Sequence, residues 1–88
     1  MIEMLSTKLR LLREFHGYTQ KQVAEMLQVD RSTVSYYEAG KSSPPCDNLI
    51  RLCQFYQEST DWLLGVSDRI RDRQFEKFYR ANIQKPSP

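Results

Sequence analysis

Apolar residues recur at helical spacing along most of the chain, and each of the three glycines follows a helix-like stretch. Before Gly17, the residues Leu5, Leu9, Leu12 and Phe15 lie three or four positions apart, with charged residues between them. This spacing places apolar side chains on one face of a helix, and glycine readily adopts the left-handed conformation that ends helices. The pattern predicts a first amphipathic helix that ends near Gly17.

Two short helices are predicted next, over residues 19–27 and 31–38. Thr19 and Gln22 have the spacing of a capping box, in which the threonine oxygen accepts a backbone N–H and the glutamine side chain reaches back. Asp30 is the expected N-cap of the second of these helices. The apolar positions of the pair are Val23, Ala24, Leu27, Val34 and Tyr37.

A fourth helix and a short fifth one follow. The apolar face of the fourth helix, which begins near Asp47, consists of Leu49, Leu52, Cys53 and Tyr56. Ser59 or Thr60 is expected to cap the fifth helix, over residues 61–64, which Gly65 closes. Because no strand-like alternation appears in this sequence, the predicted fold class is all-α, with a helical extension over residues 68–83.

Composition and charge suit one small domain with a tail. The chain has 88 residues, of which 40% are hydrophobic. It contains neither the roughly 18–20-residue apolar run of a membrane helix nor a secretory signal pattern, so the expected location is the cytoplasm. Residues 1–65 hold seven Lys/Arg against eight Asp/Glu, whereas residues 66–88 hold six against three. The excess positive charge therefore lies in the tail, where a solvated helix face is the ordinary explanation.

The sequence lacks the residue clusters that enzymes and metal sites need. Cys46 and Cys53 are seven residues apart, about 10 Å on one helix, which is too far for a disulfide. His16 is the only histidine, and no CxxC pair or glycine-rich phosphate loop is present. We therefore expect no catalytic residues, no metal and no cofactor.

The two short helices carry the functional signal. Only Gln28, Val29 and Asp30 join them, and two helices joined so tightly cross steeply, so that one is presented to DNA while the other braces it. Residues 20–39 read QKQVAEMLQVDRSTVSYYEA, and LRLLRE, YEAGK and DWLLG stand at 9–14, 37–41 and 61–65. Together these segments resemble the Cro and phage-repressor class of helix-turn-helix regulators, also called the XRE family.

The resemblance covers roughly residues 6–65 and implies both fold and function. The implied fold is a compact five-helix lambda-repressor-like domain over 6–65, with its helix-turn-helix motif at 20–39 and a C-terminal extension at 66–88. The implied function is sequence-specific binding of a double-stranded DNA operator, with residues 31–38 in the major groove. A dimeric repressor on a palindrome, with half-sites about 10 base pairs apart, fits a domain of this size.

The resemblance also assigns roles to individual side chains. Those expected to face the bases are Arg31, Ser32, Ser35 and Tyr36, and those expected on phosphates are Thr19, Gln20, Thr33 and Lys41. Three alternatives stay open. Arg31 binds either a guanine or a phosphate, and Thr19 either contacts a phosphate or only caps its helix. Tyr36 either donates its hydroxyl to a phosphate or packs its ring on a thymine methyl. Members of this class pair an arginine on the first helix with a glutamate at the end of the recognition helix, which here are Arg13 and Glu38.

The sequence departs from the family at two positions. Gln28 stands in the turn where the family usually has glycine, and a left-handed non-glycine residue costs on the order of 1 kcal/mol. Glu58 occupies a position that is commonly apolar. Neither departure is expected to prevent folding.

The tail raises the question of assembly. The residues expected to form a dimer contact are Trp62, Ile70, Phe75, Phe78 and Tyr79. The aromatic side chains of the extension either pack back on the domain or join a partner subunit, and we expect the partner. A competing hypothesis is a protein-interaction module of the same fold, such as an autoregulating antitoxin or adaptor, that acts mainly through residues 66–83 rather than by reading DNA.

Overall fold

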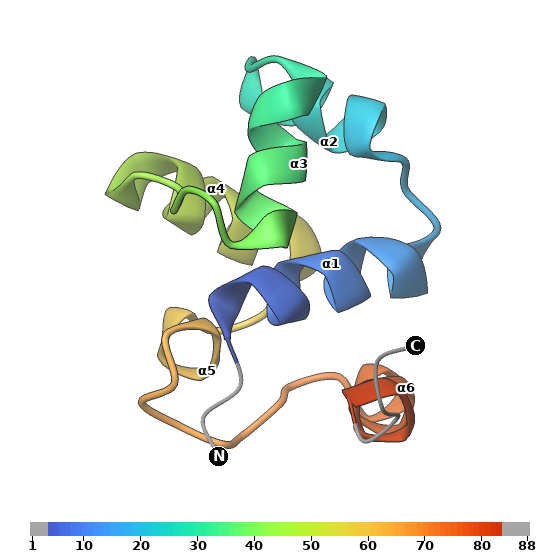
Figure 1. Cartoon of the computed structure of the whole chain (residues 1–88). Coiled ribbons are helices and arrows are strands. Elements are labelled where there is room, and N and C mark those ends of the chain that lie inside the picture. Colours follow the sequence, from blue (N-terminus) through green and yellow to red (C-terminus); the bar gives the residue numbers. More distant parts are fainter. Residues whose placement is uncertain (1–3, 84–88) are drawn as a thin grey trace.

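The computed structural model describes residues 4–83, and every regular element in that range is a helix (Figure 1). The six helices are α1 (Leu5–His16), α2 (Gln20–Leu27), α3 (Arg31–Ala39), α4 (Cys46–Tyr56), α5 (Thr60–Leu63) and α6 (Arg73–Ile83). The all-α prediction is confirmed. Residues 84–88 of the predicted extension lie outside the described range. None of the described helices is long and apolar enough to cross a membrane.

Side-chain caps predicted from the sequence are present at the starts of α2 and α5. The Thr19 hydroxyl oxygen accepts the backbone N–H of Gln22 at 3.1 Å, and the Thr19 N–H donates to the Gln22 side-chain oxygen at 2.9 Å, which confirms the capping box. Of the two candidates for α5, Ser59 is the cap. Asp30 holds the N-cap position of α3, but its predicted side-chain cap is absent; its backbone carbonyl accepts the Thr33 N–H at 3.0 Å.

Two glutamines end helices in the left-handed conformation. Gln28 closes α2 with φ 60°, and Gln57 closes α4 with φ 57°. The sequence comparison with the family indicated the first of these positions but gave no signal for the second. At Gln28 the turn lets the N–H of Val29 donate to the carbonyl of Ala24 at 3.0 Å, which ends α2 and turns the chain toward α3.

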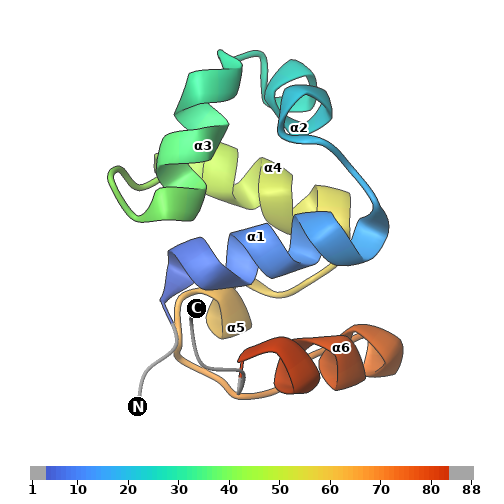
Figure 2. The same ribbon diagram turned by 45° about the vertical axis from the view of Figure 1, so that its right-hand side comes forward.

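Helix α1 forms the middle of the molecule, with α2 and α3 on one side of it and α5 and α6 on the other (Figures 1 and 2). Leu11 and Leu12 of α1 are among the most deeply buried side chains. Lys8 is also buried; its ammonium donates to the carbonyl of Trp62 and lies 4.9 Å from the centre of the indole ring. The sequence pattern did not single out Leu11 or Lys8.

The C-terminal extension packs on its own domain. Helix α6 begins at Arg73 instead of continuing from residue 68, because the Asp72 carboxylate accepts the N–H groups of Gln74 and Phe75 and so caps it. Four of the five residues expected at a dimer contact are buried: Trp62, Ile70, Phe75 and Tyr79. The expectation that these four side chains face a partner subunit is therefore wrong, since the chain's own core already encloses them. Phe78 is half-buried and packs against the same core.

The Glu58 side chain holds the connection before α6 in place. Its side chain is buried, and its two carboxylate oxygens accept the backbone N–H groups of Arg71 and Asp72 at 3.0 and 3.3 Å. Burial raises the pKa of this carboxyl above its ordinary value of 4.5, although the two hydrogen bonds act in the opposite direction. An acidic residue at this commonly apolar position thus joins the five-helix domain to its extension.

The raised pKa of Glu58 gives a pH prediction with a definite sign. The folded protein binds this proton more tightly than the unfolded chain, so the contribution of Glu58 to stability is complete below pH 4.5 and declines as pH rises through the folded-state pKa. The wild type should therefore lose stability relative to Glu58→Gln as the pH rises from 4.5 through the folded-state pKa. The measured quantity is the difference between the free energies of unfolding of the two proteins. Urea titrations of both proteins at a series of pH values measure it, and a difference that rises with pH would contradict the assignment.

Candidate nucleic-acid interface

Helices α2 and α3 form a tight unit that exposes one face of α3 (Figure 2). Val34 and Tyr37 of α3 are buried, together with Val23, Ala24 and Leu27 of α2. On the other face of α3, Arg31, Ser32 and Tyr36 are exposed, and Thr33 and Ser35 are half-buried. A helix with one buried apolar face and one exposed face of hydrogen-bonding groups has the properties needed to read a groove of nucleic acid.

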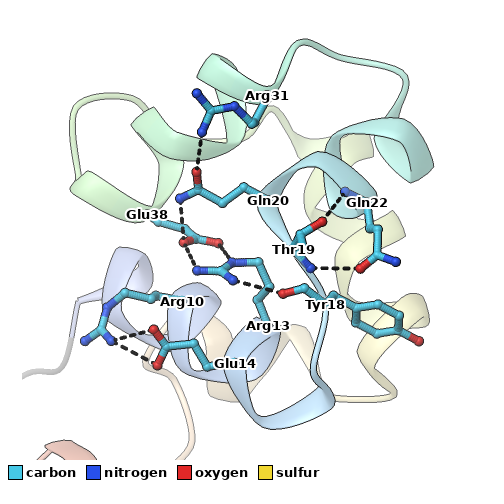
Figure 3. Close-up of polar contacts among 9 residues, drawn as sticks. All are labelled: Arg10, Arg13, Glu14, Tyr18, Thr19, Gln20, Gln22, Arg31 and Glu38. Atoms are coloured by element: carbon cyan, nitrogen blue, oxygen red, sulfur yellow. Dashed lines mark hydrogen bonds and ion pairs between the residues drawn. The ribbon is translucent and has the colours of Figure 1, made fainter.

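An ion pair fixes the end of α3 to α1. The Arg13 guanidinium donates to both carboxylate oxygens of Glu38, with Nε–Oε2 at 2.7 Å and Nη2–Oε1 at 3.0 Å (Figure 3). The two side chains are only 15% and 6% exposed. The hydrogen bond to Glu38 raises the pKa of Arg13 above its ordinary value. A bidentate pair that is largely removed from water holds the two helices in one relative orientation.

Gln20 extends this pair to the exposed face of α3 (Figure 3). Its amide nitrogen donates to Glu38 Oε1 at 3.1 Å, and its amide oxygen accepts Arg31 Nη1 at 3.3 Å. Arg13 also donates through Nη1 to the Tyr18 carbonyl at 2.9 Å, just before α2. One chain of hydrogen bonds therefore runs from α1 through Glu38 and Gln20 to Arg31. The sequence indicated Gln20 only as a phosphate contact and gave no signal for this bridge.

The other predicted contact residues border the same face. Thr19 is exposed at the start of α2, and Lys41 is exposed just after α3. The Lys41 ammonium lies 5.7 Å from the centre of the Tyr36 ring, and its backbone N–H donates to the Tyr36 carbonyl at 2.9 Å. A cation and an aromatic ring are thus placed together at the end of α3.

The comparison with known proteins decides the family. A family model described as "Helix-turn-helix" matches residues 9–63, which is more than half of the chain and includes α2, α3 and the polar network. The chain belongs to this helix-turn-helix family. The resemblance read from the residues at 20–39 and their flanks is confirmed.

Relatives of this helix-turn-helix protein are named as regulators. It is 34% identical over 83 residues to the uncharacterized HTH-type transcriptional regulator YobD of Bacillus subtilis, a match that covers 94% of this chain and 74% of YobD. It is 35% identical over 70 residues to repressor protein C of Escherichia phage P2, covering 80% of this chain and 71% of that protein. A crystal structure of a transcriptional regulator from Listeria innocua superposes with a TM-score of 0.70 at 29% identity, covering 98% of this chain and 81% of that one.

The helix-turn-helix family is one of transcriptional regulators rather than a class of enzymes. Over residues 4–83, no group of three or more His, Cys, Asp or Glu side chains is arranged to hold a metal ion. Both cysteines are free thiols; Cys46 is exposed, whereas burial raises the pKa of Cys53. The exposed face of α3 is therefore the surface whose chemistry fits this family.

Proposed function

We propose that the chain is a sequence-specific repressor that binds a palindromic double-stranded DNA operator as a homodimer, with α3 in the major groove. We assign DNA reading to residues 6–65, with the motif at 20–39, and regard residues 66–88 as an extension of that domain. The name of the phage P2 relative, repressor protein C, supports repression. A regulator of this kind acts where the DNA is, which we propose is the cytoplasm, and it needs neither a catalytic residue nor a cofactor.

The observation that carries this proposal is the braced Arg31 on the exposed face of α3. Its guanidinium is held by Gln20, which in turn bonds to the buried Arg13–Glu38 pair. A side chain oriented before binding loses less conformational freedom when it meets a base or a phosphate. Ser32 and Ser35 follow on the same helix and supply hydroxyl groups to base edges, and Tyr36 supplies a hydroxyl for a phosphate or a ring for a thymine methyl.

Phosphate contacts would set the position of α3 on the duplex. Thr19 and Gln20 stand at the N-terminus of α2, where backbone N–H groups and the helix dipole favour an anion. The Thr19 hydroxyl oxygen already accepts the Gln22 N–H, yet the hydroxyl proton can still donate to a phosphate. Thr33 and Lys41 would contact the backbone on the other side of α3. Contacts of this type fix register and carry little sequence information.

Selection of bound sequences from random duplex DNA tests the proposal directly. Purified protein at about 50 and 200 mM salt should recover a palindrome whose half-sites lie about one helical turn apart, and the salt dependence of the affinity would give the number of phosphate contacts. Recovery without a consensus, together with loss of all binding at the higher salt, would reject sequence-specific reading.

Arg31→Ala should weaken binding to the selected operator by about 5- to 150-fold, the range of about 1–3 kcal/mol for one bidentate base contact. Arg31→Lys separates the two open roles, because lysine keeps the charge for a phosphate but loses the fork that recognises guanine. Fluorescence anisotropy at constant salt measures both. Arg80→Ala is the matched control. It removes the same charge from α6, which lies on the opposite side of α1 from α3 (Figure 2). Equal losses for Arg31→Ala and Arg80→Ala would exclude Arg31 from the interface.

For the homodimer we propose a contact through the segment just after α5, in place of the buried aromatic residues. Leu64 and Val66 are apolar and remain 57% and 77% exposed. Leu64→Asp should therefore leave the fold intact but shift the protein from dimer to monomer in sedimentation velocity and weaken operator binding. Ile50→Asp, at an exposed apolar side chain on α4, is the control. A dimer that persists in Leu64→Asp would place the contact elsewhere.

A further inference from the structure

A second charged surface lies on the side of α1 away from α3. The connection between α5 and α6, together with α6 itself, lines a groove of about 1000 Å³. Five cationic side chains line it, and we call it the basic groove: Arg69, Arg71, Arg73, Lys77 and Arg80. These residues hold five of the six positive charges found at positions 66–88. The structure thus gathers the basic character of the tail on one concave surface.

Over the part of the chain that the structure describes, four of these five cations form no ion pair. Among residues 4–83, Arg69, Arg71, Arg73 and Lys77 form no ion pair, whereas Arg80 pairs with Glu76 at 3.1 Å. All five cations are exposed. Like charges held close together repel one another, and an anionic partner relieves this repulsion. The basic groove is therefore electrostatically suited to an acidic ligand.

The groove is a formed surface, since its backbone is anchored at several points. Glu58 accepts the N–H groups of residues 71 and 72, Asp72 caps α6, and the Ile70 side chain is buried. Phe75, on the first turn of α6, is fully enclosed by the core. A ligand that binds here meets cations whose backbone is already ordered, so less conformational entropy is lost on binding.

We propose that the basic groove binds an acidic segment of a partner protein. Asp61 and Glu76 also line it. This mixture of cationic and anionic side chains favours an acidic polypeptide over duplex DNA. A polypeptide can place Asp and Glu carboxylates on the arginines while its backbone N–H groups donate to Asp61 and Glu76. A duplex carries one negative charge about every 1.7 Å of helix axis, and the same two carboxylates repel it.

The position of the groove separates this partner from the operator. Helix α6 and the connection before it lie on one side of α1, and α2 and α3 lie on the other (Figures 1 and 2). DNA in contact with α3 therefore leaves the basic groove open, and an acidic partner held there could contact the regulator while it is bound to DNA. This inference extends the proposed function and does not depend on it, because the two surfaces share no residue.

Fluorescence anisotropy with a labelled peptide of alternating Asp and Glu tests the proposal on the full chain. We expect saturable binding that weakens between about 50 and 200 mM salt, as contacts between exposed charges do. Arg69→Gln combined with Lys77→Gln should weaken it by about fivefold to tenfold, from the loss of two surface ion pairs. Arg10→Gln combined with Arg51→Gln has the same net charge and should bind like the wild type. A peptide of alternating Asn and Gln should not bind.

Several results would overturn the proposal. They are an absence of Asp/Glu peptide binding, equal weakening of that binding in the two double variants, and binding of the Asn/Gln peptide as tight as that of the Asp/Glu peptide. Mixed-sequence duplex DNA that displaces the peptide, and that itself loses affinity in the Arg69→Gln/Lys77→Gln variant, would replace the protein partner with nucleic acid. Operator binding by the same variant is measured in parallel. If operator binding is retained while peptide binding is lost, the two functions are separate, and either can fail without the other.

Discussion

Replacing Phe75 with alanine is expected to lower the free energy of unfolding by about 3–5 kcal/mol, the usual range for truncating a fully buried phenylalanine. Phe75 is 0% exposed. Its ring meets those of Phe15 and Trp62 edge-on, with centroids 5.4 and 5.6 Å apart. The substitution would open a cavity where α6 packs against α1 and α5, and the loss would be a large fraction of the stability of a small domain.

Urea unfolding followed by circular dichroism measures this loss. Phe78→Ala is the matched control, because Phe78 lies on the same helix but is only half-buried, so its loss should be clearly smaller. Repeating the titration at several protein concentrations separates packing within one chain from packing across a dimer. A Phe75→Ala protein as stable as the wild type, or a loss that depends on protein concentration, would contradict packing of α6 on its own domain.

The second large effect is expected at Glu38. Glu38→Ala leaves the Arg13 guanidinium largely buried without its carboxylate and should cost about 3 kcal/mol of stability, the low end of the range for breaking a buried pair. It also removes the acceptor for the Gln20 amide, which holds Arg31. We therefore expect operator affinity to fall as well, even though Glu38 lies behind the exposed face of α3.

The control is the exposed pair formed by Arg10 and Glu14. These side chains are 3.2 Å apart and well solvated, so Glu14→Ala should change stability by less than about 0.5 kcal/mol. Arg13→Ala combined with Glu38→Ala should cost less than the sum of the single variants, because the double variant leaves neither charge unpaired. Equal losses for Glu38→Ala and Glu14→Ala, or strict additivity in the cycle, would argue against the bracing role.

Interactions between residues close in sequence could be predicted from the chain alone. The capping box of Thr19 and Gln22 spans three residues, and glycine positions marked helix ends. Such contacts depend mainly on local backbone geometry, which residue type and spacing determine. The family resemblance added the left-handed turn at Gln28 and the pairing of Arg13 with Glu38, both of which are present. The exposed polar face of α3, which we propose reads DNA, could therefore be predicted from the sequence.

Only the tertiary structure decided where the tail and the bridging side chains go. An apolar stripe shows that Phe75 and Tyr79 need burial but not whether the chain itself or a partner provides it, and here the chain does. Glu58 and Gln20 find their partners 11 to 18 residues away in sequence. Such contacts follow from how the helices pack, which residue spacing does not encode. The sequence alone thus determined the helices and the polar face of α3 that we propose reads DNA, whereas packing determined the bracing of Arg31 and the basic groove.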